Sequence, residues 1–235
     1  MKKLSIILIL FFAVQLCFVS CQTSFELIKA HGCNDDTPNW GESLGEVSFK
    51  TNQTWIVGNQ EWSDVVMASA CQKESYIGRQ RPCNSDKELC FISDCRSNLG
   101  YGDLFSWCAV VRFQNELCPD DWRVPTRKDF IALDKALGGT GKHRRIHHPD
   151  DRHIESRYIN VWDGSHGGYG SWDVMNDNLN AYKLYNQNSM GLYWSQSSKS
   201  KNGAYGLRLW DDLSIHPQYT DHKGDAFMLR CVRNK

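Results

Sequence analysis

The sequence predicts one α+β domain in which small mixed or antiparallel sheets surround one main helix and a long loop region. A complete helix signal occurs over residues 126–137, and several short segments alternate apolar and polar residues as strands do. Residues 138–190 are rich in Gly, Asn, Asp, Tyr and Trp but poor in aliphatic residues. With 235 residues, 41% of them hydrophobic, the chain is large enough for one generous core.

The first twenty residues have the composition of a secretion signal. Two lysines precede an apolar run, residues 6–14, that is too short to span a bilayer. The segment ends in FVSC, residues 18–21, which resembles a bacterial lipobox, although Phe18 stands where Leu is usual. We therefore expect an exported protein that is anchored by a lipid on Cys21 in the cell envelope, on the outer membrane surface. The alternative is ordinary signal-peptidase cleavage, with Cys21 left as a structural thiol.

The balance of positive and negative side chains excludes partners that would be attracted by a strong electrostatic field of the protein. Lys plus Arg equals Asp plus Glu at 27 each, and loss of the two leader lysines leaves 25 against 27. We expect no nucleic-acid partner and no membrane contact other than the lipid. The mean hydropathy of −0.52 excludes an integral membrane protein.

Cysteine usage predicts disulfides. Removing Cys17 with the leader and Cys21 as the lipid carrier leaves eight of the ten cysteines, an even number in an exported chain. A zinc site at Cys83, Cys90 and Cys95 is the alternative, but the chain has no Cys-x-x-Cys pair.

Residues 21–44 are expected to form a tether, and the domain is expected to span residues 45–235. Residues 47–50 and 54–57 alternate as half-buried strands and predict an opening hairpin with its turn at 51–53. Residues 66–100 hold four cysteines and little periodic hydrophobicity, which predicts a loop insert with local disulfides. Residues 101–111 are densely apolar and are expected in the core.

The main helix has both of its end signals. Thr126 can cap the N-terminus, and Asp129 lies in the first turn, where the helix dipole favours a carboxylate. Phe130, Leu133 and Leu137 share one face, and a pair of glycines then provides the C-terminal cap.

The second half predicts a functional loop and the closing strands. Residues 138–190 are too long for an ordinary connection, and such loops on a rigid frame commonly carry function. Strands are predicted at 191–194, 205–209, 213–215 and 227–232.

Five motifs resemble the Fibrobacter succinogenes major paralogous domain, a family common in exported proteins of Bacteroidetes and Fibrobacteres. They are VGNQEW at 57–62, YGDLFSW at 101–107, CPDDWRVPT at 118–126, YWSQS at 193–197 and LRCVR at 229–233. Two positions depart from the family pattern. Asp121 replaces a usual Gly, and Ser63-Asp64 replaces the usual continuation of the first motif.

The resemblance implies a fold like that of C-type lectins and a disulfide between Cys118 and Cys231. Eight cysteines allow about 105 pairings. For the other six cysteines we predict three disulfides. They join Cys71 to Cys95, Cys83 to Cys90 within the loop that the first pair closes, and Cys33 to Cys108.

The tryptophans fall into two groups by context. Trp62, Trp107, Trp122 and Trp194 are expected as core anchors because each brings a large apolar area to a strand or turn. The ligand face is expected on the long loop and the turns beside it, where aromatic rings stand next to short polar side chains. Its predicted residues are Trp172, Asn176, Asp177, Trp210, Asp211, Asp212 and Tyr219. The alternative is that these side chains only pack the loop against the sheet.

No motif for nucleophilic, metalloprotease, dinucleotide or phosphate chemistry is found, so no catalytic residue is assigned. The lectin-like outline also resembles formylglycine-generating enzymes, for which Cys108 and Cys118 are the comparable cysteines. In the histidine-rich stretch, His147 with Asp151 or His148 with His153 could in principle chelate a metal, but the arginines among them favour a solvated loop.

We therefore expect a non-catalytic module that binds a glycan or a protein at the cell surface without a metal or cofactor. The alternatives are a structural subunit of a surface appendage or envelope assembly, and an enzyme of the formylglycine-generating type.

Overall fold

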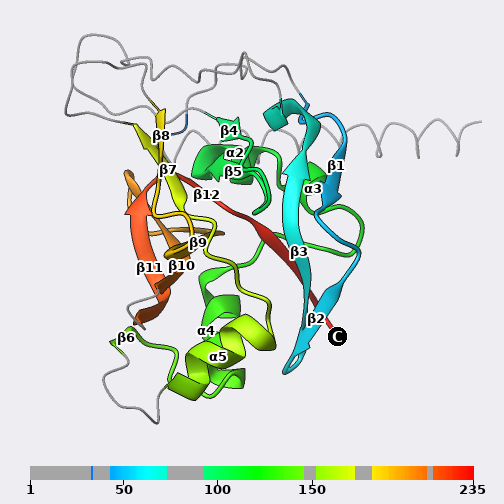
Figure 1. Cartoon of the computed structure of the whole chain (residues 1–235). Coiled ribbons are helices and arrows are strands. Elements are labelled where there is room, and N and C mark those ends of the chain that lie inside the picture. The colour runs from blue at the N-terminus through cyan, green and yellow to red at the C-terminus, as the bar shows by residue number, and fades with distance from the viewer. Residues whose placement is uncertain (1–32, 34–42, 73–92, 146–151, 173–181, 211–213) are drawn as a thin grey trace, which may run out of the picture.

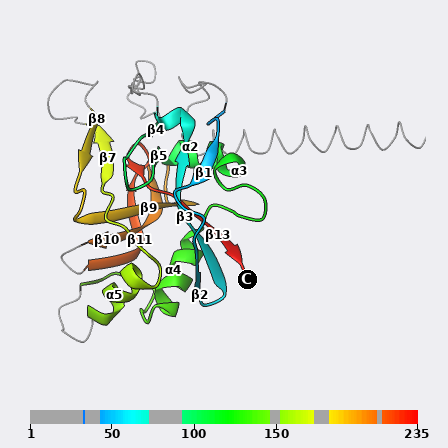
Figure 2. The same ribbon diagram turned by 45° about the vertical axis from the view of Figure 1, so that its right-hand side comes forward.

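The computed structural model describes residue 33 and residues 43–72, 93–145, 152–172, 182–210 and 214–235. Its strands form three sheets, and all of the pairings between these strands are antiparallel. Figures 1 and 2 show α4 (Arg127–Ala136) and α5 (Arg152–Asn160) side by side at one end, with the hairpin of β7 (Tyr169–Trp172) and β8 (Tyr182–Tyr185) at the other. Within the described ranges, no helix is long and apolar enough to cross a membrane.

The first sheet corrects the predicted opening hairpin. Strands β1 (Val47–Phe49) and β2 (Thr54–Val57) do not pair with each other but lie one after the other along β3 (Gln60–Ala68). The chain turns instead at Gly58-Asn59, where Gly58 has a φ of 62°. A two-residue hairpin turn needs this conformation, and glycine adopts it without strain. Strand β13 (Arg230–Asn234) pairs with the other edge of β3.

A buried cation fixes β13 to this sheet. Arg230 is 1% exposed, and its guanidinium carbon lies 4.4 Å from the ring centroid of Trp55 and 4.6 Å from that of Trp162. The guanidinium donates to the carbonyl oxygen of Trp162 and lies 3.7 Å from a carboxylate oxygen of Asp64. Asp64 is in turn held by a 2.7 Å hydrogen bond from the Thr51 hydroxyl.

The predicted main helix is confirmed as α4. Thr126 is its N-cap, and the backbone N–H of Thr126 donates to Asp129 at 2.7 Å to complete a capping box. Arg123 adds two hydrogen bonds to the same carboxylate, at 2.7 and 2.8 Å. This charged cluster fixes the direction in which α4 leaves the preceding turn.

The segment predicted as one long loop, residues 138–190, contains more structure than expected. It includes β6 (Arg144–Arg145), α5 and the β7–β8 hairpin. Helix α5 buries Ile154 and Tyr158, and the tyrosine hydroxyl donates to Asp134 of α4 at 2.9 Å. A narrow apolar stripe therefore forms this helix within a segment of loop-like composition.

The closing strands are confirmed, but their extents differ from the prediction, and the last one is divided. Strands β9 (Met190–Ser198), β10 (Gly203–Trp210) and β11 (Ser214–His222) form one sheet with β6 in the order β6-β11-β10-β9. Strand β11 is longer than predicted. The predicted strand 227–232 is divided into β12 (Ala226–Phe227) and β13, which belong to different sheets.

The third sheet connects the cysteine-rich region to the hairpin. It has the order β4-β5-β12-β7-β8, with β4 at Cys95–Arg96 and β5 at Leu104–Ser106. Two short helices, α2 (Trp107–Arg112) and α3 (Gln114–Leu117), follow β5, and a 3-10 turn (Ser69–Gln72) follows β3.

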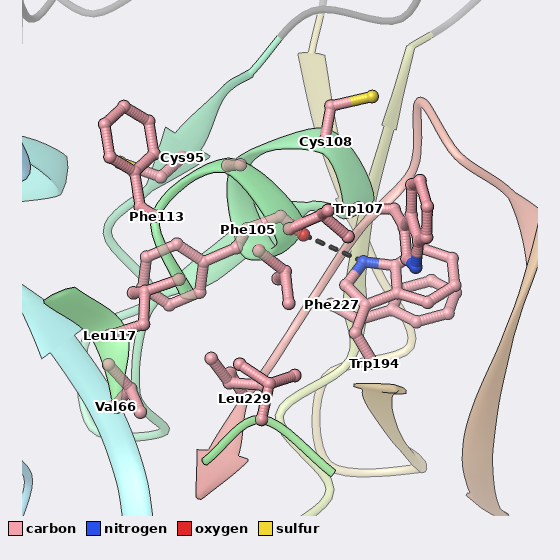
Figure 3. Packing of buried hydrophobic residues seen from close by; sticks show 14 of the residues in the cluster. Val66, Cys95, Phe105, Trp107, Cys108, Phe113, Leu117, Trp194, Phe227 and Leu229 are labelled. Atoms are coloured by element: carbon pink, nitrogen blue, oxygen red, sulfur yellow. Dashed lines mark hydrogen bonds between the residues drawn. The ribbon is translucent and has the colours of Figure 1, made fainter. Parts of the chain in front are cut away.

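The core interpretation of the tryptophans is confirmed for Trp62, Trp107 and Trp194, which are at most 1% exposed, whereas Trp122 is half-buried. In Figure 3 the Trp194 indole lies against Phe227, with ring centroids 3.9 Å apart. Its N–H donates to the Phe105 carbonyl at 2.9 Å. A buried indole with a satisfied N–H group, as at Trp194, is typical of a core anchor.

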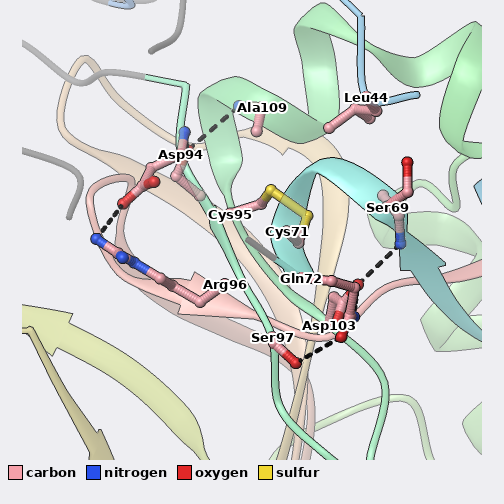
Figure 4. Close-up of a disulfide and its surroundings, with 12 residues drawn as sticks. Leu44, Ser69, Cys71, Gln72, Asp94, Cys95, Arg96, Ser97, Asp103 and Ala109 are labelled. Carbon is pink, nitrogen blue, oxygen red and sulfur yellow. Dashed lines mark hydrogen bonds and ion pairs between the residues drawn. A yellow bond between two sulfur atoms is a disulfide. The ribbon is translucent and has the colours of Figure 1, made fainter. Parts of the chain in front are cut away.

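Three disulfides are present among the described residues, and each is a predicted pair. They join Cys33 to Cys108, Cys71 to Cys95 and Cys118 to Cys231. Figure 4 shows the Cys71–Cys95 bond beside the ion pair of Asp94 and Arg96. The predicted Cys83–Cys90 pair lies outside the described residues.

Candidate ligand-binding face

One face of β10 and β11 carries a cation among aromatic rings. Leu207 and Leu209 point into the core, so Arg208 and Trp210, at the alternate positions, lie on the opposite face. The register of β11 shifts between its partners Gly206 and Arg208, which brings His216 and Tyr219 to this same face. We call Arg208, Trp210, His216 and Tyr219 the Arg208 face.

Arg208 is the centre of this face. Its guanidinium carbon lies 4.6 Å from the ring centroid of Tyr219 and 5.1 Å from that of Trp210, within the range of cation–π attraction. The side chain is half-buried, and its Nε atom is buried without a hydrogen-bond acceptor. No ion pair joins Arg208 to a carboxylate in the part of the chain that the structure describes. The guanidinium therefore keeps donor capacity that these residues do not use.

The surroundings of His216 are positively charged. Its ring stacks on His143 with centroids 4.6 Å apart and meets the Tyr219 ring edge to face at 5.8 Å. Burial, followed by the positive charges of His143, Arg208 and Lys199, lowers the pKa of His216 to about 4. His216 is therefore a neutral aromatic group at neutral pH, and its pKa reports a local positive field.

An acidic pair borders the Arg208 face on the side of the β7–β8 hairpin. The Tyr219 hydroxyl donates to Asp221 at 2.9 Å. Burial raises the pKa of Asp225 to about 7, and the neighbouring Asp221 adds to this rise, while a hydrogen bond from Ser171 of β7 opposes it. Near neutral pH the Asp225 carboxyl group is therefore partly protonated.

The structure brings together only some of the predicted ligand residues. Trp210 and Tyr219 both lie against Arg208, but in strands rather than in loops or turns. Trp172 is the last residue of β7. The other four, Asn176, Asp177, Asp211 and Asp212, lie outside the described residues.

Sequence reasoning missed Arg208 and His216. The available signal was the alternation of Leu207 and Leu209, which places Arg208 and Trp210 on one face of a strand. The position of His216 depends on a register shift between strands, and no local pattern indicates such a shift.

The two cysteines considered for an enzyme are both oxidised. Cys108 is bonded to Cys33 and Cys118 to Cys231, and both are at most 4% exposed. In the described part of the chain, no group of three or more His, Cys, Asp or Glu side chains could hold a metal ion. His147 and His148 of the histidine-rich segment are not among these residues.

Comparison with known proteins identifies the family. The Fibrobacter succinogenes major domain matches residues 51–233, a span that begins just before β2 and ends within β13. No curated protein and no solved structure matches the chain. The match covers well over half of the chain and confirms the resemblance of its five motifs. The chain therefore belongs to the Fibrobacter succinogenes major domain family.

Proposed function

We propose that this protein is a non-catalytic binding module of the cell surface that holds a glycan on the Arg208 face. The observation that carries the proposal is the arrangement of Trp210 and Tyr219 around Arg208. Sugars present apolar C–H faces and hydroxyl groups, and aromatic rings beside hydrogen-bond donors match both.

We also infer that the domain has the arrangement of C-type lectins. The long excursion between α4 and the closing strands supports this inference, as does the Cys118–Cys231 bond between the start of the helical region and the last strand. A solved structure in which β9–β11 occupy a different place relative to α4 would contradict it.

The disulfides support binding over catalysis. An enzyme of the formylglycine-generating type requires a reactive thiol, and Cys108 and Cys118 are each held in a disulfide. We expect the native mature protein to show no rapidly titrating thiol with a water-soluble thiol reagent. A thiol that titrates without denaturant would favour the enzyme.

A glycan array with the mature protein tests the proposed function. We expect binding to at least one class of host or plant glycan, and we expect Trp210→Ala and Tyr219→Ala to weaken it about tenfold or more. Trp122→Ala is the matched control because Trp122 is a half-buried tryptophan that lies under Arg233, outside the Arg208 face. It should lower the melting temperature but keep the affinity. Unchanged affinity in both face variants would refute the site.

We further propose that a lipid on Cys21 retains the protein at the outer membrane surface. Two or three acyl chains anchor a protein stably, whereas one does not. Cys21→Ala should move the protein from the membrane fraction to the soluble exported fraction. Cys17→Ala is the control, since that residue leaves with the leader. Equal membrane retention of both variants would contradict lipid anchoring.

A further inference from the structure

The Arg208 face lies at a basic edge of a chain that has no net charge. Strand β6 pairs with β11 and belongs to a run of four basic residues, 142–145. Lys199, at the start of the turn from β9 to β10, donates to Thr220 of β11 at 3.3 Å. His143 beside β6, Arg208 of β10 and Lys199 after β9 thus place positive charge around His216, while the charges of the whole chain cancel.

These positive charges affect the pKa of His216. The positive charges of His143, Arg208 and Lys199 all act to lower its pKa, in addition to burial. Among the described residues, the acidic residue nearest in sequence is Asp221, which accepts hydrogen bonds from the Tyr219 hydroxyl and the His222 backbone N–H and interacts with the Asp225 carboxyl. Among the described residues, no carboxylate forms an ion pair with Arg208.

Arg208 has the chemistry that an anionic group requires. A guanidinium binds a carboxylate or a sulfate through two parallel hydrogen bonds, and a partly desolvated guanidinium does so more strongly than one in water. Stacking on Trp210 and Tyr219 fixes its plane, so little side-chain freedom is lost when an anion binds.

We infer that the ligand of the Arg208 face is an acidic glycan, whose carboxylate or sulfate groups bind Arg208 while its sugar rings lie against Trp210 or Tyr219. This inference rests on the proposed function and adds the chemical class of the ligand. A sugar unit that carries an anionic group presents a negative charge beside an apolar ring face. The Arg208 face presents the matching cation beside aromatic rings. The positive charge is local, which suits a short anionic segment better than an extended polyanion.

The test compares glycans that differ in charge. Calorimetric titration of the mature chain would use oligogalacturonate, its methyl-esterified neutral form, and chondroitin sulfate. We expect at least one charged glycan to bind tenfold or more tightly than the neutral ester. Its binding should weaken as NaCl rises from 50 to 300 mM because salt screens the attraction, with a Debye length of about 10 Å at 100 mM. Oligogalacturonate carries carboxylates alone, whereas chondroitin sulfate carries both carboxylates and sulfates, so binding of chondroitin sulfate alone would assign the recognition to the sulfate.

Two arginine variants make the assignment specific. Arg208→Gln should remove the preference for charged glycans. Arg127→Gln is the matched control, since Arg127 lies 4.6 Å from the Tyr205 ring centroid and donates to Gln218, outside the Arg208 face. It should retain the preference. If Arg208→Gln fails to fold, Arg208→Lys tests the paired hydrogen bonds instead: it keeps the charge but loses the planar pair of donors, and it should weaken the binding of charged glycans.

The outcomes separate the two proposals. Binding of the neutral ester as tightly as the acid, unaffected by Arg208→Gln, would overturn the acidic ligand and leave glycan binding intact. Absence of binding to any glycan would overturn the proposed function itself. Binding of a single-stranded oligonucleotide with equal affinity and the same dependence on Arg208 would show a general anion site and overturn the inference.

Discussion

Arg230 illustrates how one residue can hold two parts of the domain together. It lies between Trp55 of β2 and Trp162, which follows α5, and its charge faces Asp64 of β3. A buried ion pair contributes little net stability, but loss of one partner leaves the other charged in an apolar medium.

We therefore predict that Arg230→Met lowers the free energy of unfolding by about 3–5 kcal/mol, measured in urea. The double variant Arg230→Met, Asp64→Asn should recover part of this loss because no unpaired charge remains. Arg233→Met is a comparison at a partly exposed arginine over Trp122 and should have a much smaller effect. No recovery in the double variant would show that ring packing, rather than charge, causes the loss.

Asp225 makes stability depend on pH. Its pKa is raised from 3.8 to about 7, so the folded state holds a proton that the unfolded state releases. The resulting stabilisation is fully present below pH 4 and is lost as the pH rises to about 7.

Asp225→Asn should therefore flatten the fall in melting temperature between pH 4 and 8, by several degrees over this range, at about 2–4 °C per kcal/mol. Asp120→Asn removes the same charge from an exposed position and should keep the slope of the natural protein. A variant at position 225 with an unchanged slope would exclude this carboxyl group as the cause.

At the scale of single residues, the core was more predictable than the site. The buried tryptophans are large and apolar, and their place follows from their own chemistry. The sequence around Arg208 does not show that it belongs to a site. Only the pairing register of β10 and β11 places it between Trp210 and Tyr219.

The elements differ in how locally they are encoded. Both ends of α4 are determined by residues within the helix or next to it, and its boundaries were predicted to within one residue. Alternation in β1 and β2 indicated strands correctly but could not indicate their partner, β3. Helix α5 was missed because its apolar stripe is narrow and lies among polar residues.

The capping box of α4 provides a prediction at this scale. Thr126→Ala should lower the free energy of unfolding by about 1 kcal/mol, because the helix loses its side-chain cap. Thr126→Ser keeps the hydroxyl and should retain most of the stability. Equal loss in both variants would assign the effect to the Thr126 methyl group. Urea titration of the two purified variants measures the difference.

At the scale of the whole molecule, the disulfides close loops of very different length. The Cys71–Cys95 pair spans 24 residues and the Cys118–Cys231 pair spans 113. Chain entropy gives about 3 kcal/mol for the shorter loop and about 5 kcal/mol for the longer one, before any change in the native state.

Replacing Cys118 and Cys231 together with Ala should therefore destabilise the domain more than the same change at Cys71 and Cys95. Denaturant unfolding of the two double variants measures both losses. A larger loss for the shorter loop would mean that native packing around that bond outweighs chain entropy.

The two longest disulfide loops also decide how the protein responds to tension. Cys33 is joined to Cys108, and Cys118 to Cys231, so a pull between the segment before Cys33 and the C-terminus bypasses most of the backbone. The backbone that such a pull can extend consists of the nine residues between Cys108 and Cys118 and the four after Cys231, or about 50 Å at full stretch. Under such a pull the oxidised protein would thus stretch very little, whereas the reduced chain would unravel along its whole length.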